Sequence, residues 1–133
     1  MELQVGVKIL LKNKSGKYLV ALRSAEKYPD AGAQWEIIGR RINPGTSLAE
    51  NLKREVMEET GLKITGEPKL ISAQDIFSTI KNKHTVRLTY SGFADGEVKL
   101  SDEHTQYKWL SLEELLILNP IDPFLKEVLE KFL

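Results

Sequence analysis

The first third of the chain alternates apolar and polar residues in the way a sheet does. Apolar side chains occupy every second position over 5–11, which is the period of a half-buried strand. The polar turn at 14–17 leads into a second apolar run at 18–22, so these segments predict a β-hairpin. Proline, glycine and small residues without a period predict a loop over 28–35, and a short strand is expected at 36–38.

A helix is predicted over residues 48–60, where apolar residues recur at helical spacing. The turn at 43–45 precedes it, and Ser47 with Glu50 three residues later has the pattern of a capping box. Gly61 follows the last periodic residue, as expected of a glycine that ends a helix in the left-handed conformation.

The second half of the chain predicts another hairpin and two more helices. β-Branched and aromatic residues are frequent over 69–79 and 84–93, and 106–110 reads as a short strand. Ser111 is expected to cap one helix, and Asp122 to open the last one, whose apolar face is formed by Phe124, Leu125, Val128, Leu129 and Phe132. Mostly antiparallel strands with helices on both sides predict an α/β (α+β) class fold.

Composition limits the function classes. The chain of 133 residues is expected to form a single domain, residues 1–133. Nineteen basic and nineteen acidic residues balance, so no overall field attracts a nucleic acid or an anionic membrane. The absence of cysteine excludes thiol chemistry and is typical of a cytoplasmic protein. The first fourteen residues have neither a basic leader nor an unbroken apolar run, so we expect no signal peptide and no membrane span there.

Three glutamates crowd the end of the predicted helix. With about 100° per residue and Glu55 at zero, Glu59 falls near +40° and Glu58 near −60°. The apolar positions Leu52 and Val56 fall near +60° and +100° on the same wheel, so the glutamates adjoin the buried stripe. Burying an unpaired carboxylate is costly, and carboxylates at a helix C-terminus also face the negative end of the helix dipole.

A bound cation would compensate for this crowding. Mg²⁺ and Mn²⁺ prefer oxygen ligands, and carboxylates spaced three and four residues apart on a helix can converge on one or two ions. The alternative is a solvated helix face held by pairs such as Glu50 with Arg54. A solvated face should lie opposite the apolar stripe, so the spacing favours the metal site.

The segment 54–62, REVMEETGL, resembles the second half of the Nudix box, G-x5-E-x7-R-E-U-x-E-E-x-G-U with U aliphatic, and matches every specified position. The pair at 35–36 and the segment 101–115, SDEHTQYKWLSLEEL, also resemble this family. The resemblance covers nearly the whole chain and implies a Nudix-type α/β/α sandwich around a mixed, largely antiparallel sheet.

The first half of the box departs from the family pattern. Counting back from Arg54, the box glycine falls on Arg40 and the box glutamate on Thr46. Gly39 is retained, so its carbonyl can still ligate a metal ion as the equivalent residue does in the family. Loss of the glutamate removes the expected partner of Arg54 and weakens support for the metal ligands.

The resemblance implies a Mg²⁺- or Mn²⁺-dependent hydrolase that cleaves the pyrophosphate linkage of a nucleoside diphosphate derivative, such as a nucleoside triphosphate. A divalent cation neutralises charge on phosphate oxygens and lowers the pKa of bound water, and a carboxylate takes the proton. The implied metal ligands are Gly39, Glu55, Glu58, Glu59 and Glu103. The implied catalytic residues are Arg54, Glu55, Glu58 and Glu103, and which glutamate is the general base stays open.

Four further residues are candidates for binding the substrate. Arg23 and Arg40 would contact phosphates, although single arginines are more often simple surface residues. Trp35 and Phe77 would stack on a base, although isolated aromatic residues usually belong to a core.

A competing hypothesis is a catalytically impaired nucleotide-binding or regulatory module, because Arg40 and Thr46 replace two box residues. The expected partner in either case is a small-molecule nucleotide, with no nucleic acid and no membrane. A homodimer is compatible with the sequence if an edge strand, such as the first, pairs across a twofold axis.

Overall fold

The computed structural model describes residues 1–30 and 32–132. Each expected strand and helix is present among them, with bounds that differ by a few residues from those predicted. In chain order the elements are β1 (Glu2–Lys12), β2 (Tyr18–Arg23), β3 (Trp35–Glu36), α1 (Leu48–Thr60), β4 (Thr65–Ser78), β5 (Lys83–Phe93), β6 (His104–Leu110), α2 (Leu112–Leu116) and α3 (Pro123–Phe132).

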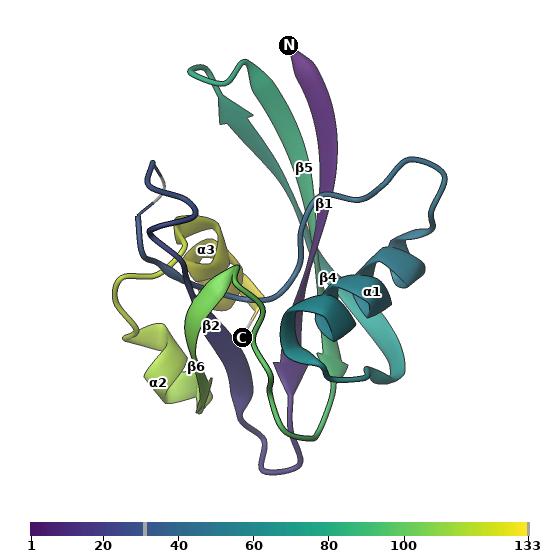
Figure 1. The fold of residues 1–133 in the computed structure, drawn as a ribbon, viewed down its shortest axis with the longest axis vertical. Helices are drawn as coiled ribbons and strands as arrows, with labels where there is room; N and C mark the ends of the chain where they lie inside the picture. Colours follow the sequence, from purple (N-terminus) through teal and green to yellow (C-terminus); the bar gives the residue numbers. More distant parts are fainter. Residues whose placement is uncertain (31, 133) are drawn as a thin grey trace.

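The strands form one mixed, mostly antiparallel sheet in the order β3-β2-β1-β5-β4, and β6 pairs with β2. β1 runs parallel to β5, whereas the other paired strands are antiparallel. Helix α1 lies on one side of this sheet and α2 with α3 on the other (Figure 1). The predicted α/β/α sandwich is therefore confirmed.

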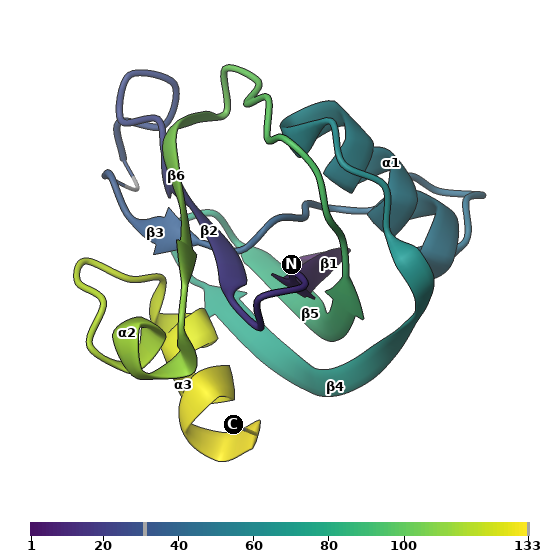
Figure 2. The ribbon, with the colours of Figure 1, turned by 90° about the horizontal axis from the view of Figure 1, so that it is seen from below.

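The first strand is not an edge of the sheet, so the suggestion that it is an edge strand available for pairing across a twofold axis is wrong. β1 pairs with β5 along its whole length, from Glu2 with Lys83 to Lys12 with Phe93. Its other side pairs with β2 only at Lys12 and Tyr18, because β2 then turns away to pair with β3 and β6. Seen from below, β4 curves around the outside of β5, with which it pairs, and ends the sheet on that side (Figure 2).

Both faces of the middle of β1 are buried, which explains its nearly continuous apolar sequence. Val7, Ile9 and Leu11 point to the side of α1, where they join Leu52 and Val56 of that helix. Leu10, between Ile9 and Leu11, lies on the opposite face in the cluster that contains Leu125 and Leu129 of α3. Successive strand residues alternate between faces, so one strand serves two cores.

The ends of α1 follow the predicted signals in part. The Ser47 hydroxyl accepts a hydrogen bond from the Glu50 N–H at 3.1 Å, and Gly61, at φ 72°, closes the helix by donating to the Met57 carbonyl at 2.9 Å. The return bond from the Glu50 side chain, which would complete the capping box, is not among the hydrogen bonds of the described residues. The N-terminal cap and the terminal glycine are thus confirmed.

Three parts of the sequence predictions lie outside the described residues: residue 31 of the loop at 28–35, the side chain of Phe132 on the face of the last helix, and residue 133 at the end of the expected domain.

Within the described part of the chain, no helix has the length and apolar character needed to cross a bilayer.

Candidate active site

A cleft of about 300 Å³ lies between the sheet, the end of α1 and the loop before β6. Its lining holds six cationic residues and three glutamates, a surplus of three positive charges, which suits an anionic ligand. The cationic residues are Lys8, Arg23, Arg40, Arg41, Lys81 and Arg87, and the glutamates are Glu36, Glu59 and Glu103. Two of the four predicted substrate-binding residues, Arg23 and Arg40, are therefore at this cleft.

The floor of the cleft is a buried ion-pair network around Glu36, which sequence reasoning did not single out. Its Oε1 atom lies 3.3 Å from Lys8 Nζ and 2.5 Å from Arg23 Nη2, and its Oε2 atom lies 2.9 Å from His104 Nε2. Burial opposes the charged carboxylate, but Lys8, His104 and Arg23 outweigh that effect and hold the pKa of Glu36 well below its usual range. A signal existed, because Lys8 and Glu36 each interrupt an otherwise apolar strand.

The helical wheel placed all three α1 glutamates beside the buried stripe, and this is confirmed for Glu55 and Glu59 but wrong for Glu58. Glu55 and Glu59 are 6% and 3% exposed, whereas the Glu58 side chain is 60% exposed. The Oε2 atoms of Glu55 and Glu59 are buried and have no hydrogen-bond partner among the described residues. Burial is the main reason that the pKa of Glu59 rises to about 7, although Lys8 and His104 act against it. A solvated face is therefore excluded for Glu55 and Glu59.

Asn51 takes over part of the role expected of the missing box glutamate. This residue is fully buried, and its Oδ1 atom accepts hydrogen bonds from Arg54 Nη2 and from the Asn43 N–H, both at 3.0 Å. Its amide group donates to the carbonyls of Thr46 at 3.1 Å and Ser47 at 2.7 Å. Arg54 in turn lies 3.0 Å from Glu55 Oε1, so the loop before α1 and the first buried glutamate are held together through Asn51.

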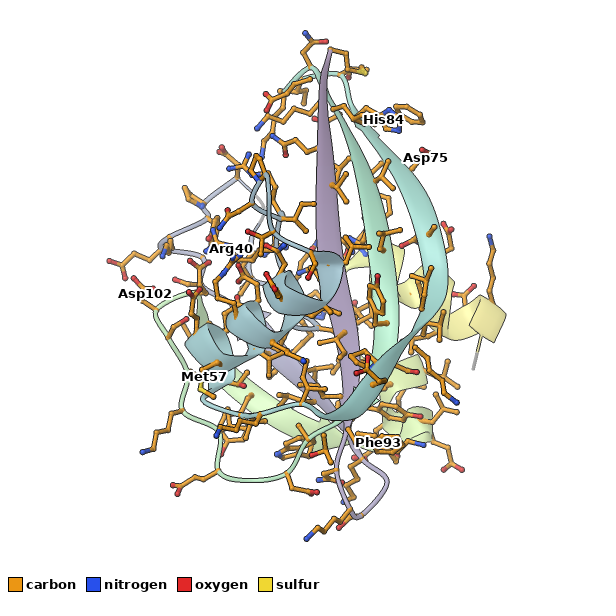
Figure 3. All side chains as sticks on the ribbon, turned by 90° about the vertical axis from the view of Figure 1, so that its right-hand side faces the viewer. Arg40, Met57, Asp75, His84, Phe93 and Asp102 are labelled. Atoms are coloured by element: carbon orange, nitrogen blue, oxygen red, sulfur yellow. The ribbon has the colours of Figure 1, made fainter. Side chains whose placement is uncertain are left out.

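Glu103, the distal acidic candidate, is engaged on both of its oxygens. Its Oε1 atom lies 2.7 Å from Lys27 Nζ and 3.0 Å from Arg40 Nη1, and its Oε2 atom accepts a hydrogen bond from the Tyr28 hydroxyl. Although burial opposes the charged form, Lys27, Tyr28 and Arg40 lower the pKa of Glu103. Arg40 lies on the same side of the molecule as Asp102, whereas His84 and Asp75 lie toward the far edge of the sheet (Figure 3).

Gly39 lines the cleft at a place where only glycine fits. Its φ of 137° is a conformation that L side chains rarely adopt, and a Cβ atom would come within 2.0 Å of the Val7 carbonyl oxygen. The adjacent backbone pairs with β1, since the Ile9 N–H donates to the Ile38 carbonyl and the Val7 N–H to the Arg40 carbonyl. These hydrogen bonds hold the segment against β1 at the edge of the cleft, and the missing side chain of Gly39 permits the close approach.

The arrangement suits a divalent cation without preforming its complete ligand set. Among residues 1–30 and 32–132, no three histidine, aspartate or glutamate side chains converge as a ready-made metal site. The Oε2 atoms of Glu55 and Glu59, one helical turn apart, are nevertheless hard donors, and leaving buried carboxylate oxygens without a hydrogen-bond partner is costly. A divalent cation with water ligands would satisfy both, so the residues fit the group.

The two aromatic candidates lie apart from the cleft. Trp35 is 6% exposed in the core cluster on the α3 side, with Lys108 Nζ 4.9 Å from its ring centroid. Phe77 stacks on His84 with ring centroids 4.5 Å apart, and neither residue is in the lining of the cleft. Sequence reasoning instead missed Arg87, which lines the cleft and is held by Asp122 at 2.5 Å.

Comparisons with known proteins agree with these observations. The sequence pattern of the NUDIX domain matches residues 2–132. The nucleoside triphosphatase NudI of Escherichia coli is 30% identical over 116 residues, which cover 80% of this chain and 81% of that protein. The crystal structure of a MutT protein from Methanosarcina mazei Go1 superposes with a TM-score of 0.87 at 29% identity, covering 98% of this chain and 93% of that one.

A second solved structure supports the fold alone. The MutT NUDIX hydrolase from Burkholderia pseudomallei has a TM-score of 0.85 at 20% identity, and the match covers both chains completely.

Proposed function

The chain belongs to the Nudix family of hydrolases, and from that premise we propose that it cleaves the pyrophosphate linkage of nucleoside triphosphates with the help of Mg²⁺ or Mn²⁺. The observation that carries the proposal is the pair of buried, unpartnered oxygens on Glu55 and Glu59 beside a cleft with surplus positive charge. The similarity to a nucleoside triphosphatase supports this substrate class. We place the reaction in the cytoplasm, in keeping with the absence of cysteine.

We assign the metal ion to Glu55, Glu59 and the Gly39 carbonyl. When bound, a divalent cation neutralises charge on phosphate oxygens and lowers the pKa of water. Arg54, braced by Asn51, holds Glu55 Oε1 and leaves the Oε2 atom free for the cation. These contacts give Arg54 a positioning role.

Proton transfer is assigned to Glu58. Its side chain is 60% exposed and its Oε1 atom lies 3.8 Å from Arg54 Nε, a loose contact from which it can turn toward an attacking water. In the alternative assignment, Glu58 is instead a further metal ligand beside Glu55, Glu59 and the Gly39 carbonyl. Glu58→Gln distinguishes the two roles: a fall in kcat with unchanged metal affinity supports proton transfer, and a fall in metal affinity supports ligation.

Phosphate binding is assigned to the cationic lining of the cleft. Arg23, Arg40, Arg41, Lys81 and Arg87 offer guanidinium and ammonium groups to a chain of phosphates. Arg23 is fixed by Glu36 and Arg87 by Asp122, so both present their remaining donors in a fixed direction. Preformed cationic groups of this kind orient the phosphate chain without reorganisation.

Turnover of a panel of nucleotides with Mg²⁺ and Mn²⁺ tests the proposal. Glu59→Gln should abolish most metal-dependent turnover, whereas Glu50→Gln, on the exposed side of α1, should leave it unchanged. Undiminished turnover by Glu59→Gln would contradict the assignment.

A nucleotide-binding module without turnover is the competing proposal, because Arg40 and Thr46 replace two box residues. Tight nucleotide binding by the native protein with no phosphate release on any member of the panel would favour this module over the enzyme.

A further inference from the structure

We propose that Arg40 is a cation built into the chain that competes with a divalent metal ion for Glu103. In the native protein the metal site is then assembled without that carboxylate. The inference rests on the proposed function, since it concerns the same cleft, and it concerns a residue at which this chain departs from its family's pattern.

The contacts of Glu103 leave it no free oxygen. Arg40 Nη1 lies 3.0 Å from Oε1, Lys27 Nζ lies 2.7 Å from the same atom, and the Tyr28 hydroxyl donates to Oε2. Arg40 Nη2 also donates to the Tyr28 oxygen at 3.2 Å, which closes a ring of three side chains. A metal ion that approaches Glu103 competes with these donors and remains beside two positive charges.

Arg40 also interacts with the α1 carboxylates. Partial burial disfavours its charge, yet Glu103, Tyr28, Glu55 and Glu59 together raise the pKa of Arg40 above its ordinary value. The guanidinium is therefore attracted by both halves of the carboxylate set that a metal ion would use.

The glycine of the family pattern has no side chain with which to do this. The backbone at residue 40 is held in place, because its carbonyl accepts a hydrogen bond from the Val7 N–H at 3.0 Å. The Arg40 side chain is 49% exposed, so it can leave Glu103 without disturbing the cores. Removing the side chain should therefore free Glu103 while leaving the fold intact.

Mn²⁺ binding to the metal-free protein, followed by electron paramagnetic resonance of the free ion and by calorimetry, tests the inference. Arg40→Ala should tighten Mn²⁺ binding by about tenfold or add a second site, the order of magnitude for removing one nearby charge from a half-exposed site. Arg40→Lys should keep the native affinity. Arg41→Ala removes the same charge from the next residue, which has no bond to Glu103 among the described residues, and should change the affinity by less.

A double variant identifies the carboxylate. Glu103→Gln should have little effect on Mn²⁺ binding in the native background and should remove the gain in the Arg40→Ala background. If urea melts show that Arg40→Ala is unfolded, Arg40→Gln replaces it as a neutral side chain of similar length.

The outcomes separate the two proposals. Equal Mn²⁺ affinity and stoichiometry in the native protein and the Arg40→Ala variant would overturn the role of Arg40 and leave the proposed function standing. No Mn²⁺ binding by any folded variant would overturn the metal-dependent function itself. Unchanged Mn²⁺ binding together with a rise in nucleotide KM would leave Arg40 only the phosphate contact proposed above, and would likewise overturn the inference.

Discussion

Replacing Asn51 with alanine should remove the main connection between the loop before α1 and Arg54. The fully buried amide makes four hydrogen bonds, to the Asn43 N–H, the Thr46 and Ser47 carbonyls and Arg54. Each bond contributes roughly 1 kcal/mol, but the loop partners are near water and recover part of that loss, so we expect about 3 kcal/mol of destabilisation. For a domain of this size, the same loss lowers Tm by roughly 10 °C.

Urea unfolding followed by circular dichroism measures this cost as a shift of the midpoint at unchanged slope. Glu50→Ala is the matched control, because it alters the neighbouring residue of the same helix and removes only an exposed side chain. It should change stability by no more than about 0.5 kcal/mol. An Asn51→Ala variant that is within about 1 kcal/mol of the native protein would show that the amide does not brace this loop.

Three further predictions concern the backbone, the pH dependence and the buried network. Gly39→Ala should destabilise the protein by about 4 kcal/mol or prevent folding, since its Cβ would overlap a carbonyl of β1. Gly16→Ala is the control in the same thermal melts and should cost only about 1 kcal/mol, because there is open space around Gly16. Folding raises the pKa of Glu59 from 4.5 to about 7, so protonation of this carboxyl stabilises the metal-free protein. Its contribution to the free energy of unfolding is complete below pH 4.5 and is lost as the pH rises through about 7. In urea melts at a series of pH values, the Glu59→Gln variant should lose this pH dependence of stability, which amounts to about 3 kcal/mol in all. An unchanged pH dependence would refute the assignment of the raised pKa to Glu59. Lys8→Met should cost about 3 kcal/mol by leaving Glu36 short of a partner, and the double variant with Glu36→Gln should lose less than the sum of the two single variants in the same melts.

Local patterns in the sequence predicted the elements because the signals are themselves local. Ser47 and Gly61 mark the ends of α1 through bonds to residues within four positions, and the glutamate angles follow from the helical repeat alone. The same repeat placed Glu55 and Glu59 beside the core, where the structure has them.

Partners from distant segments were beyond this reasoning. Glu36 meets Lys8, Arg23 and His104 only after the four strands that carry these residues have come together, and the sequence around Glu36 does not indicate which residues these partners are. The alternation of β1 predicted a strand but not its neighbours, so its place inside the sheet was missed. Isolated aromatic residues such as Phe77 carry no signal for the face on which they lie.

The parallel pairing of β1 with β5 has a consequence for how the protein is made. Each paired residue of β1 has its partner 81 positions later, as for Glu2 with Lys83, so the central ladder consists entirely of distant contacts. During synthesis the first strand must wait, with its apolar side chains uncovered, until β5 has left the ribosome. We therefore expect folding to be late and slow compared with helical proteins of similar length, and the nascent N-terminal segment to be the part most prone to aggregate.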